Sequence, residues 1–247
     1  MSPLLSKKVG ITLYWSAILL AESPTLWADD DFIVYSPQVT YGQSEAELRG
    51  FHSQDTRPGL NGLGAFESSI AHTFTDWWKV EFYTSTYEQT PGLGTQYSGQ
   101  ELENTFQLTE TGQYPVDVGL LASYAQVPIP GLPNSLEIGP LLQTRLGYTE
   151  HILNIICQKD VGAGALPGCH MREAYSFRYR LTTPFSPGFE AYNRPFDRAR
   201  QLGPAFYGEF KVGHGGKELE YSAALLYGTN YGAPDRTMVL RLEYEFF

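Results

Sequence analysis

Hydrophobic and polar residues alternate with a period of two along much of the chain. In one such segment Lys79 and Glu81 separate the apolar residues Trp78, Val80 and Phe82, and the pattern recurs further along. Consecutive side chains of a β-strand point to opposite faces, so each segment has one apolar and one polar face. A sustained apolar stripe with helical spacing is not found, and the pattern therefore predicts an all-β protein.

Turn-forming residues divide the chain at regular intervals. Short connections are expected near 75–76, 110–113, 146–149, 182–186 and 213–216. Longer connections, rich in glycine and proline, are expected at 54–62, 88–99, 127–134, 160–171, 193–199 and 228–236. Alternating short turns and long loops are typical of transmembrane β-barrels, and the segments between them predict about twelve antiparallel strands.

The predicted barrel must be closed, because an open edge would leave unpaired backbone groups in hydrocarbon. The first strand, near 44–53, is therefore expected to pair with the last, 237–247. An even number of strands predicts that both chain ends lie in the periplasm. The residues before the first strand, 29–43, either extend it across a bulge at Gly42 or fold inward as a plug, and the sequence leaves both alternatives open.

The N-terminus has the layout of a secretory signal peptide, which is expected to cover residues 1–28. Lys7 and Lys8 precede an apolar run at 9–21, and small residues follow as far as Ala28. The run has about thirteen residues, fewer than the roughly twenty of a spanning helix. Cleavage is therefore expected to leave a single barrel domain, 29–247. A lipoprotein leader is disfavoured because no cysteine is near the exit.

The net charge and the aromatic residues narrow the class of protein further. The net charge is −10, which argues against nucleic acid as a partner because such binding depends on Lys and Arg contacts to phosphate. Aromatic residues lie close to the predicted turns, and Phe74, Trp78, Tyr244 and Phe246 are expected to form an aromatic girdle against outer-membrane lipid. The alternative is a soluble periplasmic sandwich or lipocalin-like barrel with its apolar face turned inward.

The final segment, TMVLRLEYEFF, resembles the C-terminal strand of Gram-negative outer-membrane barrel proteins. Phe247 lies one residue beyond the usual register. Residues 103–124 and 219–246 also resemble an uncharacterised group of proteobacterial outer-membrane proteins, often labelled as transporters. The resemblance implies a barrel in the outer membrane whose terminal aromatic residue is read by the barrel-insertion machinery, and it implies no activity.

Residue parity assigns the charged side chains to the lumen. The predicted lumen-lining acids are Glu45, Glu47, Glu67, Glu81, Glu101, Glu103, Asp117, Glu137, Glu190, Glu209, Glu218, Glu220, Glu243 and Glu245. The bases are Arg49, Lys79, Arg145, Arg172, Arg178, Arg180, Lys211 and Arg241. This excess of acids predicts a passive channel for small hydrophilic solutes that is weakly cation-preferring or non-selective.

Two other interpretations of these charges remain. They could pair across the narrow lumen, for instance Arg178 with Glu190, and fill it as the core of a structural or partner-binding barrel. Alternatively, Arg178 and Arg180 form a pair of like charges that could hold an anionic group of a solute.

Catalytic and metal-binding patterns are weak, so we expect neither a metal nor another cofactor. Ser68 and His72 on one strand are about 13 Å apart at about 3.3 Å per residue, too far for a nucleophile and its base. The side chains of His52 and Ser53 point to opposite faces. A lipid-active enzyme is therefore the least favoured function. Cys157 and Cys169 flank a glycine-rich loop, and in an exported chain they predict a disulfide.

Overall fold

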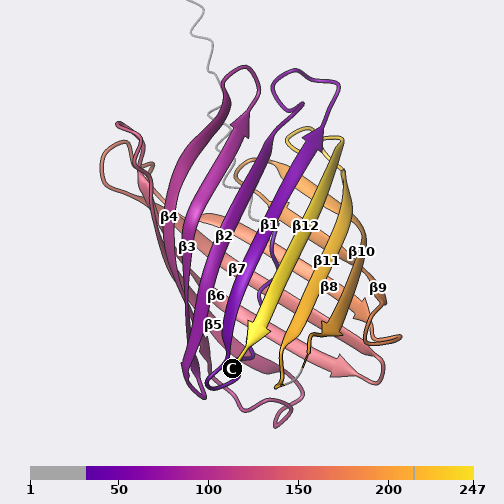
Figure 1. The fold of residues 1–247 in the computed structure, drawn as a ribbon. Helices are drawn as coiled ribbons and strands as arrows, with labels where there is room; N and C mark the ends of the chain where they lie inside the picture. Colours follow the sequence, from indigo (N-terminus) through magenta and orange to yellow (C-terminus); the bar gives the residue numbers. More distant parts are fainter. Residues whose placement is uncertain (1–31, 214) are drawn as a thin grey trace, which may run out of the picture.

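The computed structural model describes residues 32–213 and 215–247, and these form a closed barrel of twelve antiparallel strands (Figure 1). The strands are β1 Ser44–Gln54, β2 Gly64–Thr75, β3 Trp78–Thr90, β4 Gly94–Gln107, β5 Asp117–Gln126, β6 Asn134–Leu146, β7 Thr149–Val161, β8 His170–Tyr179, β9 Ser186–Arg194, β10 Ala199–Lys211, β11 Glu218–Gly228 and β12 Arg236–Phe246. The predicted fold class and strand number are confirmed. The described residues contain no helix with the length and apolar character needed to cross a membrane.

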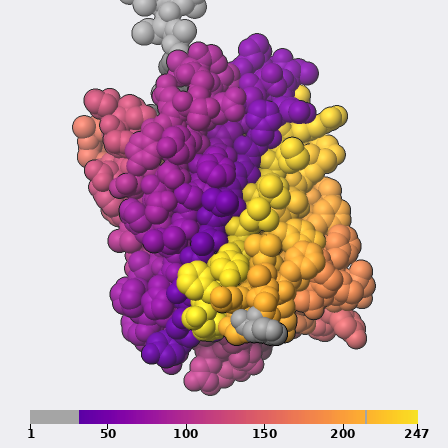
Figure 2. All heavy atoms as spheres, in the orientation of Figure 1, coloured from indigo at the N-terminus to yellow at the C-terminus, as the bar shows by residue number. Residues whose placement is uncertain are grey.

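The first and last strands close the barrel. β1 and β12 pair antiparallel over their whole lengths, from Ser44 opposite Phe246 to Gln54 opposite Arg236. Every other strand pairs with its two neighbours in sequence. Figure 2 shows the yellow atoms of β12 packed directly against the indigo atoms of β1. The expected pairing is confirmed, and the closed ladder leaves no open strand edge.

Short turns and long loops lie at opposite ends of the barrel. The connections 76–77 and 147–148 lie at the end where β1 starts and β12 ends, which we call the turn end. The opposite end, the loop end, carries the connections 55–63, 127–133, 162–169 and 229–235. The predicted alternation therefore holds for most connections.

Two of the predicted connections were wrong. Most of 88–99 is strand, because β3 runs to Thr90 and β4 starts at Gly94. Cross-strand pairs such as Tyr87 with Tyr97, whose ring centres are 5.7 Å apart, extend the hairpin. The expected short turn at 110–113 is instead part of the longer connection 108–116, which is fixed by a hydrogen bond from the Gly112 amide to Asp117.

Side chains alternate between the two faces of the wall as the pattern predicts. On β12, Met238 and Leu240 are exposed on the outside, whereas Val239 is buried inside. The inner face is less uniform than expected. On β1, β11 and β12 its charged residues occupy the turn-end half, and the loop-end half carries apolar side chains such as Phe51, Ala224 and Val239.

Close backbone approach interrupts the wall between β10 and β11. The ladder is regular at Leu202 opposite Tyr227 and resumes at Ala205 opposite Ala224. Gly203 lies in the gap, where an added Cβ would be 1.9 Å from the carbonyl oxygen of Leu225. Backbone atoms cannot give way as a flexible side chain can, so the position requires glycine.

We predict that Gly203→Ala lowers the free energy of unfolding by about 1–3 kcal/mol, the usual cost of forcing extra volume into a packed site. Denaturant titration of the refolded barrel, followed by its heat-modifiable shift on gels, measures this. Gly59→Ala is the matched control, because nothing lies within 4 Å of its added Cβ. Equal stability of the two variants contradicts the prediction.

Two loops are tied together above the closing seam. In the connection after β1, the Arg57 guanidinium bonds Asp55 and donates to the carbonyl of Ala233, at 2.7 Å, in the connection before β12. The Asp55 carboxylate also accepts a hydrogen bond from the Asp235 amide at 2.9 Å. The hydrogen bond from Arg57 lowers the pKa of Asp55 from 3.8 to about 2 because it favours the charged carboxylate.

Because the pKa of Asp55 is lowered, the stabilisation from its bond with Arg57 is fully present above pH 3.8 and is lost as the pH falls through about 2. We predict an NMR titration midpoint near pH 2 for the Asp55 carboxyl in micelles, and a midpoint closer to 3.8 in Arg57→Gln. A wild-type midpoint at the ordinary value would show that Arg57 does not hold the Asp55 carboxylate in this way.

Candidate functional site

The segment that precedes β1 lies inside the barrel, so of the two sequence alternatives the structure has the inward-folded one (Figure 1). We call residues 32–43 the lumen segment; residues 29–31 of the predicted extension lie outside the described residues. Its side chains Phe32, Tyr35 and Pro37 are all buried. Phe32 packs edge-on against Phe51 of β1 and Tyr192 of β9, with ring centres 4.9 and 5.2 Å away.

Polar side chains of the wall hold the middle of the lumen segment. The Asn154 amide accepts a hydrogen bond from the Tyr35 N–H at 2.7 Å and donates to the Tyr35 carbonyl at 2.9 Å. Three residues further on, Gln38 donates to Asp117 at 2.9 Å and accepts from Arg145 at 3.1 Å. The segment therefore crosses from the β12 side of the lumen to the β5–β7 side.

Arg241 joins the start of the lumen segment to the wall. Its Nε donates to the carbonyl of Phe32 at 2.9 Å, and its two terminal nitrogens contact both carboxylate oxygens of Glu190 at 2.9 and 3.0 Å. Tyr192 and Tyr207 also donate to Glu190, at 2.7 and 2.9 Å. With four donors around it, the buried carboxylate is fully satisfied.

The predicted pairing of Arg178 with Glu190 is wrong. The β8–β9 register places Arg178 opposite Gly188 and Glu190 opposite Ser176. Arg241 of β12, three strands away around the barrel, pairs with the Glu190 carboxylate instead. Arg178 instead lies over the ring of Tyr207, 5.4 Å from its centre.

A second group of charges lines β1–β3. Arg49 forms an ion pair with Glu67 and donates to the hydroxyl of Tyr83 at 2.8 Å. Lys79 bonds Glu45 at 2.8 Å. These contacts join β1 to β2 and to β3 along the wall, so many of the predicted lumen charges neutralise one another locally.

Two more ion pairs lie on the β6–β8 wall. Arg172 bonds Glu137 at 2.6 Å, and both side chains are only 5% exposed. Nearer the turn end, Arg145 bonds Glu150 at 2.7 Å. Glu150 is a lumen residue that sequence reasoning missed, because it immediately follows a predicted turn.

Acidic side chains collect at the turn end. Glu45, Glu243 and Glu245 place one carboxylate oxygen each within 4.8 Å of the others. The β11–β12 register brings Glu218 and Glu220 next to this group. Within 32–213 and 215–247, Glu220, Glu243 and Glu245 form no ion pair with a lysine or arginine, so no base neutralises these three side chains directly.

The remaining predicted lumen residues are placed as follows. The residues on the inner face are Glu47, Glu81, Glu101, Glu103, Glu209 and Arg178. Lys211 is exposed at the end of β10, and Arg180 lies beyond β8 in an exposed turn. Glu103 is almost fully buried and is hydrogen-bonded to the side chain of Tyr35. Arg180 donates to the carbonyl of Gly147 at 2.7 Å, so it forms no shared anion site with Arg178 on the wall.

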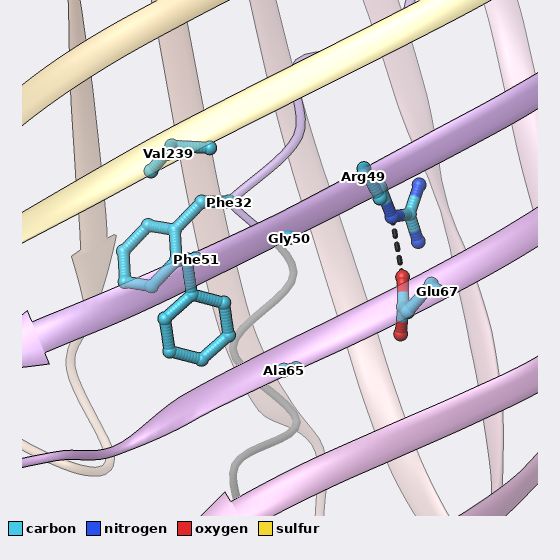
Figure 3. A pocket seen from close by; sticks show the side chains of 7 residues that line it. All are labelled: Phe32, Arg49, Gly50, Phe51, Ala65, Glu67 and Val239. Atoms are coloured by element: carbon cyan, nitrogen blue, oxygen red, sulfur yellow. Dashed lines mark hydrogen bonds and ion pairs between the residues drawn. The ribbon is translucent and has the colours of Figure 1, made fainter.

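A small cavity lies beside the start of the lumen segment. A cavity of about 20 Å³, room for about one water molecule, lies between Phe32 and the β12–β1–β2 wall. Figure 3 shows the Phe32 and Phe51 rings on one side of it and the Arg49–Glu67 ion pair on the other. The cavity thus lies where the charged and apolar halves of the inner face meet.

Apolar lining of the loop-end half was missed by the sequence analysis. The buried side chains are Phe51, Ala174, Tyr192, Ala205, Ala224, Leu226 and Val239, with Leu121, Leu141 and Ile156 across the lumen. A signal was available, because Ala223, Ala224, Leu225 and Leu226 are apolar on both faces of one strand.

The outer face shows the other predicted sites. Phe74 and Trp78, and Tyr244 and Phe246, form two ring pairs near the turn end, with centres 5.4 and 5.7 Å apart. Their role as a lipid girdle stays a prediction. A disulfide joins Cys157 and Cys169, whose Cα atoms are 5.5 Å apart.

His72 contacts a serine other than the one considered from the sequence. Its ring lies 2.9 Å from the hydroxyl of Ser44, which faces it across the β1–β2 ladder. In the described part of the chain, no carboxylate is bonded to the ring to orient it as a base. The pair therefore does not amount to a catalytic constellation.

Comparison with known proteins identifies the fold. No protein-family model and no curated protein matches the chain. Its structure is similar to an outer membrane channel from Pseudomonas putida F1, with a TM-score of 0.53 and 11% identity over 88% of this chain and 98% of that one. A bacterial polysaccharide outer membrane secretin matches with a TM-score of 0.43 and 9% identity over 84% and 99% of the two chains. The similarity to the Pseudomonas putida protein and the closed twelve-stranded topology show that the chain has the fold of an outer-membrane β-barrel.

We predict that Glu190→Gln lowers the free energy of unfolding by about 3–5 kcal/mol, because it leaves the Arg241 charge in the lumen without its carboxylate. Denaturant titration of the refolded barrel measures the loss. Glu110→Gln removes an exposed turn carboxylate and is expected to change stability by less than about 0.5 kcal/mol. A similar loss of stability in both variants would mean that the buried Glu190–Arg241 pair makes no specific contribution to the free energy of unfolding.

Proposed function

We propose that this protein is an outer-membrane channel for small hydrophilic solutes that prefers cations to anions. The observation that carries the proposal is the group of acids at the turn end, where Glu220, Glu243 and Glu245 face the lumen without a neutralising base. Fixed charges on a pore wall attract ions of the opposite sign and repel ions of the same sign. The similar protein from Pseudomonas putida is described as an outer membrane channel, which agrees with this proposal.

The same proposal includes the surroundings of the barrel. The exposed apolar side chains of its outer face, among them Phe66, Ile70 and Leu240, contact outer-membrane lipid. The start of β1 and the end of β12 lie on the periplasmic side, and the insertion machinery reads the aromatic residues that end β12.

A non-conducting structural or partner-binding barrel is the second candidate. The observation that favours it is the inward-folded lumen segment, which is bound to the wall through Arg241, itself paired with Glu190. Purified protein in a planar bilayer separates the candidates, because a structural barrel passes no current.

We predict that the wild-type reversal potential in a KCl gradient has the sign of cation preference, and that Glu243→Gln with Glu245→Gln shifts it toward zero. Glu173→Gln is the matched control, since it removes a carboxylate from the outer face of β8. Three results would contradict the proposed function. They are loss of cation preference in the control as well, anion preference in the wild type, and the absence of any current.

A further inference from the structure

The lumen segment is bound to the wall without being part of it. Between Phe32 and Val39 its backbone is held by wall side chains: Arg241 at Phe32, Asn154 at Tyr35 and Gln107 at Val39. Backbone pairing with a strand begins only at Gly42, whose N–H donates to Thr73 at 3.0 Å. Removing residues 32–39 from the lumen therefore breaks no hydrogen bond of the closed ladder.

A pivot joins the lumen segment to β1. Gly42 has a φ of +80°, and nothing lies within 4 Å of the position where its Cβ would be. The residue before it, Tyr41, is 69% exposed. Glycine in open space at the end of an element can absorb the change in backbone angles that a swinging segment requires. Since this pivot lies at the turn end, the segment can leave only through that end.

The wall group that holds Phe32 keeps its other hydrogen bonds with or without the segment. When the bonds to the Phe32 carbonyl break, the Arg241 guanidinium keeps Glu190, the Ser222 hydroxyl at 2.9 Å and the Tyr192 hydroxyl at 2.8 Å. Its charge therefore stays compensated after release, and no unpaired ion is left in the lumen. This arrangement has two self-consistent states, one with the segment bound and one with it released.

We propose that residues 32–39 are a tethered gate that swings out of the turn end about Gly42, and that Arg241 is the latch that holds it closed. The inference rests on the proposed channel function and adds its regulation. In the closed state the segment contacts the wall on both the β12 side, through Phe32, and the β5 side, where Pro37 meets Gly119. In the open state the path from the acids at the turn end into the lumen is no longer blocked by the segment.

A reversible disulfide tests whether the segment moves. An added Cβ at Gly119 would lie 2.8 Å from the Cβ of Pro37, so Pro37→Cys with Gly119→Cys can be bridged after a small shift. The variant is made with Cys157→Ser and Cys169→Ser, and Gly119→Cys in the same background is the control. Oxidation is expected to lower the mean bilayer conductance at least about tenfold, and reduction to restore it, in the double variant only.

The outcomes separate the gate from the channel. Equal current in the oxidised and reduced forms overturns the gate and leaves the channel standing. If neither the oxidised nor the reduced form conducts, the channel function is overturned. The gate is then overturned as well, unless Pro37→Cys alone reacts with a bulky water-soluble maleimide. Such a reaction at this buried position shows that the segment leaves the lumen of a barrel that does not conduct.

Arg241→Lys tests the latch. Lysine keeps a positive charge for Glu190 but lacks the planar fork that also reaches the Phe32 carbonyl. Maleimide reaction at Pro37→Cys is expected to become about tenfold faster, as for the loss of one charged hydrogen bond. Arg236→Lys, at the exposed start of β12, is the matched control and leaves the rate unchanged. An unchanged rate in Arg241→Lys shows that Arg241 is no latch.

Discussion

The closed hydrogen-bond ladder is the constraint on which the rest of the structure depends. Backbone groups in hydrocarbon need partners within the protein, and the full pairing of β1 with β12 supplies the last of them. Once the ladder is closed, the pleat fixes which side chains face outward and which face the lumen. Met238 and Leu240 are thereby assigned outside, and Val239 and Arg241 inside.

The sequence predicted what the pleat and the turn residues determine locally. Strand number, closure and the inward orientation of residues such as Glu45 and Glu243 follow from period-two alternation. The partner of Glu190 did not follow, because it depends on which side chain reaches across the lumen, and parity contains no information about that. Arg241 is more than fifty residues from the predicted turn between Arg178 and Glu190. It nevertheless binds the Glu190 carboxylate with both terminal nitrogens of its guanidinium.

The interior combines two chemistries that alternation cannot distinguish. On β1, β11 and β12 the inner residues are charged near the turn end and apolar further along, so the same parity holds both Glu243 and Val239. Phe32 lies at this boundary, with its ring among the apolar side chains and its carbonyl on Arg241. The sequence left the fate of residues 29–43 open because this dual contact exists only once the barrel has formed.

Accessibility of spin labels along β12 tests the assignment of faces most directly. Labels are attached to single cysteines at Met238, Val239 and Leu240 in a background lacking Cys157 and Cys169, in lipid vesicles. The account predicts that collisions with oxygen, which is enriched in lipid, are frequent at 238 and 240, and that 239 is shielded from it. High oxygen accessibility at 239, or access of a water-soluble relaxation agent to 238 and 240, would contradict the transmembrane barrel.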